Sequence, residues 1–208
     1  MTGASPLVLA SASPARLATL RSAGLAPHVV VSGVDESQVT DPNPATLAAR
    51  LAELKAEAVV ARLKEEPGLA AGAHLVLGCD SVLELDGQIL GKPDDADDAR
   101  TRWRAMRGRS GVLHTGHCLV DLDTGQQVVR SVDTVVHFAE LSDEEIEAYV
   151  DTGEPLNVAG AFTVDGLGGA FVRGLEGDPH NVIGVSLPAL REMVHELGHR
   201  WTDLWAAS

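Results

Sequence analysis

The chain has 208 residues, of which 45% are hydrophobic and 22% are charged. This length favours one domain, since single cores usually divide only beyond roughly 250–300 residues, and the composition excludes the disordered, collagen-like and coiled-coil classes. The formal net charge is -14 at pH 7 with histidine neutral, and a field of that sign repels nucleic acids and anionic membranes. An anionic ligand must therefore be held by a local cluster of donors.

Two cysteines, Cys79 and Cys118, are too few for a disulfide framework. The sequence contains no run of 18 apolar residues and no charged, apolar and small-residue pattern typical of a signal peptide. We therefore expect a protein of the reducing cytoplasm, with no membrane segment and no nucleic-acid partner.

Local signals define the elements of the first part of the chain. Ser13-Pro14 is typical of an N-cap followed by proline in the first helical turn, and Gly24 supplies a left-handed stop. Apolar residues then recur at helical spacing between Pro44 and Pro67-Gly68. The expected order is a strand over 7–10, a helix over 14–24, a strand over 29–31, a long helix over 44–67 and a strand over 75–78.

Hairpin signals dominate the second part. Asp86-Gly87 is a strong turn signal between two short apolar runs, and Ser142 with Glu145 forms a capping box that opens a helix ending at Gly153. The expected elements are strands over 82–85 and 88–90, a helix over 95–106, strands over 112–122 and 127–138, the capped helix, a hairpin of 161–164 with 170–173, and a helix over 187–197. Hairpins among helix-separated strands predict an α/β fold with a mixed sheet.

A candidate anion-binding segment lies where the first strand meets the first helix. Ser11 and Ser13 offer hydroxyl donors, the helix start offers outward backbone N–H groups, and Arg16 adds a forked cation suited to phosphate oxygens. The alternative interpretation is structural: Ser13 caps the helix and Arg16 is a solvated surface residue.

Three acids follow predicted strands. Asp35 and Glu36 come after the second strand and Asp80 comes after the third. Carboxylates at strand ends of an α/β protein lie where ligands bind, and two of them can share a divalent cation. Solvated turn acids are the alternative.

Two lysines can supply further positive charge. Lys55 lies at the edge of the apolar face of the long helix, and Lys92 stands between glycine and proline at a hairpin exit. A surface lysine that lays its stem over apolar neighbours explains Lys55 equally, and a plain turn explains Lys92.

A zinc-hydrolase motif also occurs near the end of the sequence. His195-Glu196-Leu197-Gly198-His199 matches H-E-x-x-H. Gly198 is a typical helix stop, which places His199 beyond the helix, and only Asp203 follows as a candidate third ligand. A zinc hydrolase using His195 and His199 is kept as an alternative.

Five blocks in this order resemble the Maf family of nucleoside triphosphate pyrophosphatases, and the resemblance covers nearly the whole chain. The blocks are LVLASASPARLATLRSAG at 7–24, VDES at 34–37, LAELKAEAV at 51–59, GCDSVLELDGQILGKP at 78–93, and TGEPLNVAGAFTVDGLGGAFV with GDPHNVIGVSLPAL over 152–190. The resemblance implies one domain over 1–208 with a mixed, elongated sheet, flanking helices and two lobes around a deep groove, related to inosine triphosphate pyrophosphatases. It further implies a homodimer and metal-assisted hydrolysis of nucleoside triphosphates between the α and β phosphates, with Mg²⁺ or Mn²⁺ as cofactor.

The family's functional positions carry over individually. Asp80 matches the aspartate expected to act as general base or metal ligand, and Glu36 matches the acid expected to bind metal. The expected substrate-binding residues are Ser11, Ser13, Arg16, Lys55, Lys92, Ser81 and Asp165. A triphosphate carries about four negative charges, so cations must hold it while carboxylates bring the metal.

Departures from the family pattern fall where specificity is decided. Ala15 stands where one branch has arginine and another an aromatic residue, Ser81 where threonine is common, and Asp165 where glutamine lies near the base. An ionised carboxylate accepts hydrogen bonds but donates none, so the hydrogen-bonding pattern that this chain recognises on the edge of the base should differ from that of the family. We assign neither base nor sugar, and a non-enzymatic regulator of septum formation is the main alternative function.

Overall fold

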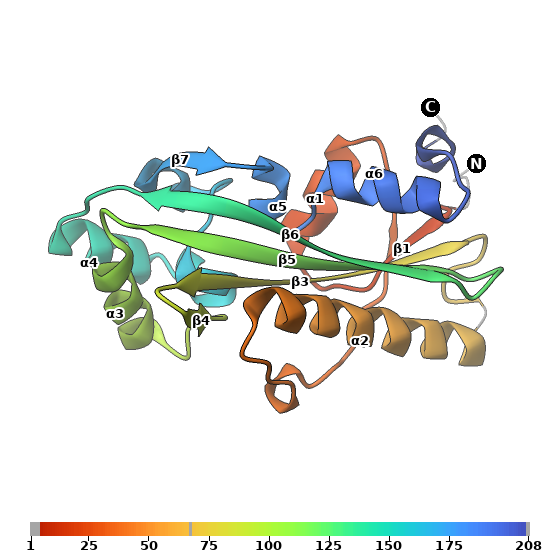
Figure 1. Ribbon diagram of the computed structural model, residues 1–208, viewed down its shortest axis with the longest axis horizontal. Helices are drawn as coiled ribbons and strands as arrows, with labels where there is room; N and C mark the ends of the chain where they lie inside the picture. Colours follow the sequence, from red (N-terminus) through yellow and green to blue (C-terminus); the bar gives the residue numbers. More distant parts are fainter. Residues whose placement is uncertain (1–4, 67, 207–208) are drawn as a thin grey trace. The chain divides into compact units, whose positions relative to one another are not determined.

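The computed structural model describes residues 5–66 and 68–206 (Figure 1). These residues form two compact units. The first comprises the described residues within Met1–Asp80, Thr115–Val132 and Gly184–Ser208, and the second comprises Ser81–His114 and Asp133–Ile183. The groove that the resemblance implies between two lobes stays a prediction.

The first unit is built on parallel strands. β1 (Leu7–Leu9) pairs in parallel with β2 (His28–Val29) and with β3 (Leu75–Leu85), and Leu7 lies opposite Leu75 in the second pairing. The helices of this unit are α1 (Pro14–Ser22), α2 (Pro44–Glu65) and α6 (Leu187–Glu196). Ser13 caps α1 by accepting a hydrogen bond from the backbone N–H of Arg16, as its position before Pro14 predicts.

Both faces of this sheet are covered by helices. Figure 1 shows α2 on one face and α1 and α6 on the other. Because side chains alternate along a strand, Leu7 and Leu9 pack in a core with residues of α1 and α6, whereas Val8 and Ala10 pack in a core with α2. Buried leucine, valine and alanine therefore hold the first unit together, in line with the low aromatic content.

The second unit contains the antiparallel pairings. Its elements are the end of β3, β4 (Gln88–Leu90), α3 (Ala96–Met106), the start of β5 (Ser110–Asp121), the end of β6 (Gln127–Phe138), α4 (Asp143–Asp151), β7 (Val172–Glu176) and α5 (Pro179–Ile183). β3 pairs with β4 and β6 pairs with β7, both antiparallel. Trp103 makes edge contacts with Phe138, Tyr149 and Phe171 at the centre of this core. Parallel and antiparallel pairs together confirm the mixed α/β fold.

Several sequence-based expectations are confirmed and two are wrong. The turn at Asp86-Gly87 has the two positive φ angles of 52° and 78° that its sequence favours, and the capping box of Ser142 and Glu145 is present. The strand expected over 75–78 runs on to Leu85, so Asp80 lies within a strand and not after one.

The hairpin expected around Gly166–Gly169 does not form. Short 3₁₀ turns occupy Glu154–Asn157, Ala159–Ala161 and Leu167–Phe171 before β7 begins. Pro67, expected to end the long helix, lies outside the described residues. Within the described part of the chain, every helix is too short or too polar to span a membrane.

Candidate functional site

Polar residues gather in the first unit where its parallel strands end. Ser11 and Ser13 follow β1, and Glu36 opens a short 3₁₀ turn (Glu36–Gln38) after β2. Asp80 lies in β3, three residues beyond Leu77, which pairs with the last residue of β1. The carboxyl ends of parallel strands are the usual place for a ligand in an α/β protein.

A buried lysine connects two of the acids. Lys55 Nζ lies 2.5 Å from Asp80 Oδ1 and 2.7 Å from Glu36 Oε1. Lys55 is 7% exposed and Asp80 is 6% exposed, whereas the side chain of Glu36 is 44% exposed. Lys55 is therefore not the surface lysine of the alternative interpretation, and Asp80 is not a solvated turn acid.

Gly78 explains how α2 brings Lys55 to this position. A Cβ at Gly78 would lie 2.2 Å from the carbonyl oxygen of Ala52 and 2.9 Å from the backbone nitrogen of Ala56. The helix backbone thus rests directly on β3 within the turn that carries Lys55, which lies three residues after Ala52 and one before Ala56. Only glycine permits so close an approach, and Asp80 is two residues further along the same strand face.

Arg16 is fixed by two acceptors in the same unit. Its Nε donates to the carbonyl oxygen of Gly184 at 2.8 Å, and its Nη1 donates to Ser11 Oγ at 3.2 Å. Ser11 Oγ also accepts from the backbone N–H of Ser13 at 3.2 Å. Ser13 does cap α1, as the structural interpretation holds, but Arg16 is half-buried and anchored instead of solvated.

The electrostatic balance of this cluster centres on Asp80. Burial raises the pKa of the Asp80 carboxyl above its usual value, while the positive charges of Lys55 and Arg16 oppose that rise. The cluster formed by Ser11, Ser13, Arg16, Glu36, Lys55 and Asp80 is called here the β3 cluster. It places two cations beside two carboxylates, one of them nearly inaccessible to water.

The carboxylates of the β3 cluster fit a divalent cation. Glu36 and Asp80, which both contact Lys55 Nζ, offer hard oxygen ligands. Mg²⁺ typically takes one or two protein carboxylates and completes its shell with water and substrate phosphate oxygens. Among residues 5–66 and 68–206, no group of three or more His, Cys, Asp or Glu side chains is arranged to hold a metal ion. Two carboxylates are the number that suits an ion sharing its coordination with a phosphate ligand.

The other expected substrate residues belong to the second unit. Ser81 follows Asp80 in β3 and is half-buried, whereas Lys92 and Asp165 are both exposed. Lys92 is next to Gly91, whose carbonyl oxygen accepts hydrogen bonds from Arg102 Nη1 at 2.7 Å and from the backbone N–H of Gly160 at 3.0 Å. These two contacts fix the backbone that presents Lys92.

Sequence reasoning missed the residues that position the site. Gly78 and Gly184 carry no functional group, yet one admits α2 and the other supplies the acceptor for Arg16. The sequence positions of the two glycines could have indicated their roles. Gly78 lies inside an apolar strand, and Gly184 lies two residues before Ser186, the N-cap of α6.

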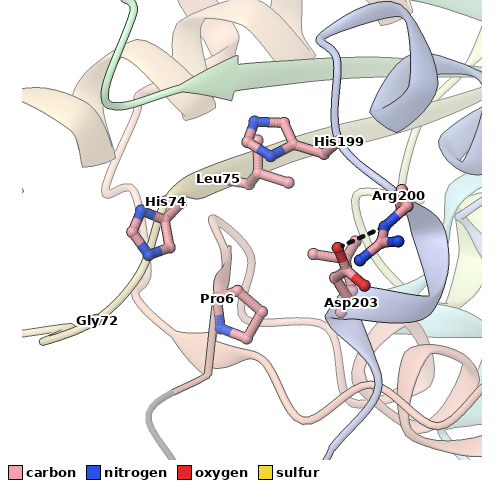
Figure 2. A pocket seen from close by; sticks show the side chains of 8 residues that line it. Pro6, Gly72, His74, Leu75, His199, Arg200 and Asp203 are labelled. Carbon is pink, nitrogen blue, oxygen red and sulfur yellow. Dashed lines mark hydrogen bonds and ion pairs between the residues drawn. The ribbon is translucent and has the colours of Figure 1, made fainter.

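The zinc-motif histidines lie in a different part of the first unit. His195 is on α6, and His199 lies beyond its end with Nε2 2.8 Å from Asp121 Oδ2. His199 and His74 line an open pocket of about 460 Å³ (Figure 2), where Arg200 is paired with Asp203. His195 is not among the residues that line it.

Fold and site together define an α/β protein with a buried lysine and carboxylate cluster at the end of a parallel sheet. The sequence model of one family, described as Maf-like protein, matches residues 6–197, so the chain belongs to the Maf family. It is 57% identical to a protein of Salinispora tropica over 99% of this chain and 91% of that protein, and 58% identical to one of Streptomyces coelicolor over 96% and 94%. A Synechococcus protein is 51% identical over 97% and 98%. All three are named nucleoside triphosphate pyrophosphatase.

Proposed function

We propose that this chain is a nucleoside triphosphate pyrophosphatase that hydrolyses its substrate between the α and β phosphates with the help of Mg²⁺ or Mn²⁺. The names of its close relatives support the activity. The observation that carries the proposal is the contact of Lys55 with both Asp80 and Glu36, because it joins a cation for phosphate oxygens to two carboxylates for a metal and a water.

Binding is assigned to the cations and hydroxyls. Arg16, held in place by Gly184 and Ser11, is assigned to the phosphate oxygens, and Ser11 and Ser13 lie beside it. Lys55 and Lys92 add point charges that offset the triphosphate. Ser81 and Asp165 complete the proposed substrate-binding set.

Asp80 is assigned the role of general base. A water oxygen forms a bond to one of the two phosphorus atoms flanking the bridging oxygen, the P–O bond to that oxygen breaks, and Asp80 accepts the proton of the water. The burial that raises the pKa of Asp80 makes it a stronger base than a solvated aspartate. A divalent ion held by Glu36 and Asp80 would offset the charge that develops on the departing phosphate group.

Pyrophosphate release from a panel of canonical and modified triphosphates tests the proposal. The wild type should release pyrophosphate and nucleoside monophosphate in equal amounts, and Asp80→Asn should abolish release while circular dichroism shows an intact fold. Asp123→Asn, which changes an exposed aspartate of the same unit, is the matched control and should keep the wild-type rate.

Three outcomes would count against the proposal. A wild type that cleaves no triphosphate would favour a non-enzymatic regulator, and an unimpaired Asp80→Asn would remove Asp80 from its role. Stoichiometric zinc that is lost in His195→Ala would favour the zinc alternative. The homodimer and the cytoplasmic location implied by the family resemblance stay predictions.

A further inference from the structure

One carboxylate of the second unit organises an entire turn. Glu154 Oε1 accepts hydrogen bonds from Thr163 Oγ1 at 2.5 Å, from the backbone N–H of Gly168 at 2.9 Å and from Tyr149 Oη at 3.0 Å. Its Oε2 accepts from the backbone N–H of Leu167 at 2.9 Å. Partial burial alone would raise the pKa of Glu154, but these four donors lower it overall, so the carboxylate stays ionised.

The turn is shaped to fit around this carboxylate. A Cβ at Gly166 would lie 2.5 Å from Glu154 Oε2, and a Cβ at Gly168 would lie 2.3 Å from Tyr149 Oη and 2.8 Å from the carbonyl oxygen of Thr163. Glycine is therefore needed at both positions because a Cβ would collide with these atoms, and not because the backbone has a positive φ. The backbone N–H of Gly169 closes the turn on the carbonyl oxygen of Gly166 at 3.1 Å.

The pinned turn presents two side chains outward. Asp165 is exposed, and Leu167 is 59% exposed although it is a large apolar residue. An exposed turn normally gains little from being held by four hydrogen bonds and two close glycine contacts. A turn that is already fixed does favour binding, because no conformational free energy is lost in ordering it when the ligand binds.

We propose that Glu154 is a positioning residue for substrate binding: its carboxylate fixes the Thr163–Gly168 turn so that Asp165 meets the nucleotide in a preset orientation. This inference rests on the proposed function, in which Asp165 contacts substrate. Glu154 itself acts only through the turn, since its oxygens are used by Tyr149, Thr163, Leu167 and Gly168.

The first test separates positioning from catalysis. Glu154→Ala should raise KM about tenfold with little change in kcat, as expected when binding must order a turn that was previously fixed. Glu154→Gln should have a smaller effect, because the amide keeps one acceptor oxygen. Some effect should remain, since its NH₂ group faces a backbone N–H and cannot accept a hydrogen bond from it. Glu144→Ala, an exposed glutamate of α4 in the same unit, is the matched control and should leave both constants unchanged.

The second test asks whether Glu154 acts through Asp165. KM should be the same in Asp165→Ala and in Glu154→Ala/Asp165→Ala, because the turn has nothing left to position once Asp165 is gone. Hydrogen exchange at the Leu167 and Gly168 amides should accelerate in Glu154→Ala. If that variant does not fold, Thr163→Val removes one donor at nearly constant volume and enters the same cycle.

The outcomes distinguish this inference from the proposed function. A wild type without hydrolysis would end the proposed function. Wild-type hydrolysis with additive effects on KM, or a loss confined to kcat, would overturn the positioning role alone. Unchanged exchange at Leu167 and Gly168 in Glu154→Ala would do the same.

Discussion

Lys55 Nζ lies 2.5 Å from Asp80 Oδ1, and the side chains of both residues are 9% exposed. A charge removed from water to this extent is costly unless a partner offsets it. Glu36 approaches the same ammonium from the solvent side at 2.7 Å. The stability of this region and the proposed chemistry therefore depend on the same three groups.

Removal of the buried cation should destabilise the protein. In Lys55→Met the Asp80 carboxylate keeps its burial but loses its nearest positive charge, so the free energy of unfolding at pH 7 should fall by about 3–5 kcal/mol. Urea denaturation measures the change. Adding Asp80→Asn to Lys55→Met should recover part of the loss, and Lys64→Met, an exposed lysine of α2, should change little. If the double variant Lys55→Met/Asp80→Asn is as unstable as Lys55→Met alone, this explanation is contradicted.

The close packing at Gly78 gives a second prediction. Gly78→Ala places a methyl group 2.2 Å from the carbonyl oxygen of Ala52, so α2 must move away from β3. We expect a loss of about 1–3 kcal/mol in the free energy of unfolding and a large loss of pyrophosphate release, because Lys55 moves with the helix. Gly68→Ala, where nothing lies within 4 Å of the added Cβ, is the control. A destabilised but fully active Gly78→Ala would show that the site does not need this packing.

Local signals predicted much of the fold. Ser13-Pro14, the Asp86-Gly87 turn and the capping box of Ser142 and Glu145 all formed as expected, because each signal is complete within a few residues. The extent of β3 was wrong for a related reason. Asp80 interrupts an apolar run and so indicates a strand end, yet a partner 25 residues away offsets its burial.

Non-local contacts account for what the sequence could not predict. The glycine-rich segment after Thr163 satisfies the signals of a hairpin turn, but its backbone N–H groups bond to Glu154, which lies 13 and 14 residues away from Leu167 and Gly168. Similarly, the helical pattern places Lys55 at the edge of an apolar face, and only the approach of α2 at Gly78 decides that it is buried. Resemblance to the family supplied the grouping of site residues that spacing alone left open.

Metal dependence should rest on Glu36. Chelation of divalent ions should abolish pyrophosphate release. Glu36→Gln should raise the Mg²⁺ concentration for half-maximal rate by at least about tenfold, because mutation of a residue that only hydrogen-bonds to a metal ligand already weakens metal binding by that much. Titration of the rate with Mg²⁺ and with Mn²⁺ measures the shift. Glu57→Gln, an exposed glutamate of α2, is the control. Full activity of the chelated protein would contradict the metal assignment of both carboxylates.

Asp121 should make stability depend on acid pH. Its Oδ1 accepts hydrogen bonds from the backbone N–H groups of Asp123 at 2.8 Å and Thr124 at 2.9 Å, and its Oδ2 lies 2.8 Å from His199 Nε2. Burial alone would raise the pKa of Asp121, but the Thr124 N–H, the His199 ring and the Asp123 N–H together lower it. The unfolded chain therefore binds a proton more readily than the folded protein, and stability from this group is present above the ordinary aspartate pKa of about 3.9 and is lost as the pH falls through the lower folded value.

The pH dependence of Asp121→Asn tests this linkage. The variant should be less stable than the wild type by about 1–3 kcal/mol at pH 7, the value typical of hydrogen bonds to a charged group. Urea denaturation between pH 7 and pH 3 should show the difference constant down to about pH 5 and shrinking below the unfolded aspartate pKa of about 3.9. Asp203→Asn, which changes an exposed partner of Arg200, should show a small difference at every pH. A deficit in Asp121→Asn that stays the same down to pH 3 would mean that the shape of the side chain matters at this position and its charge does not.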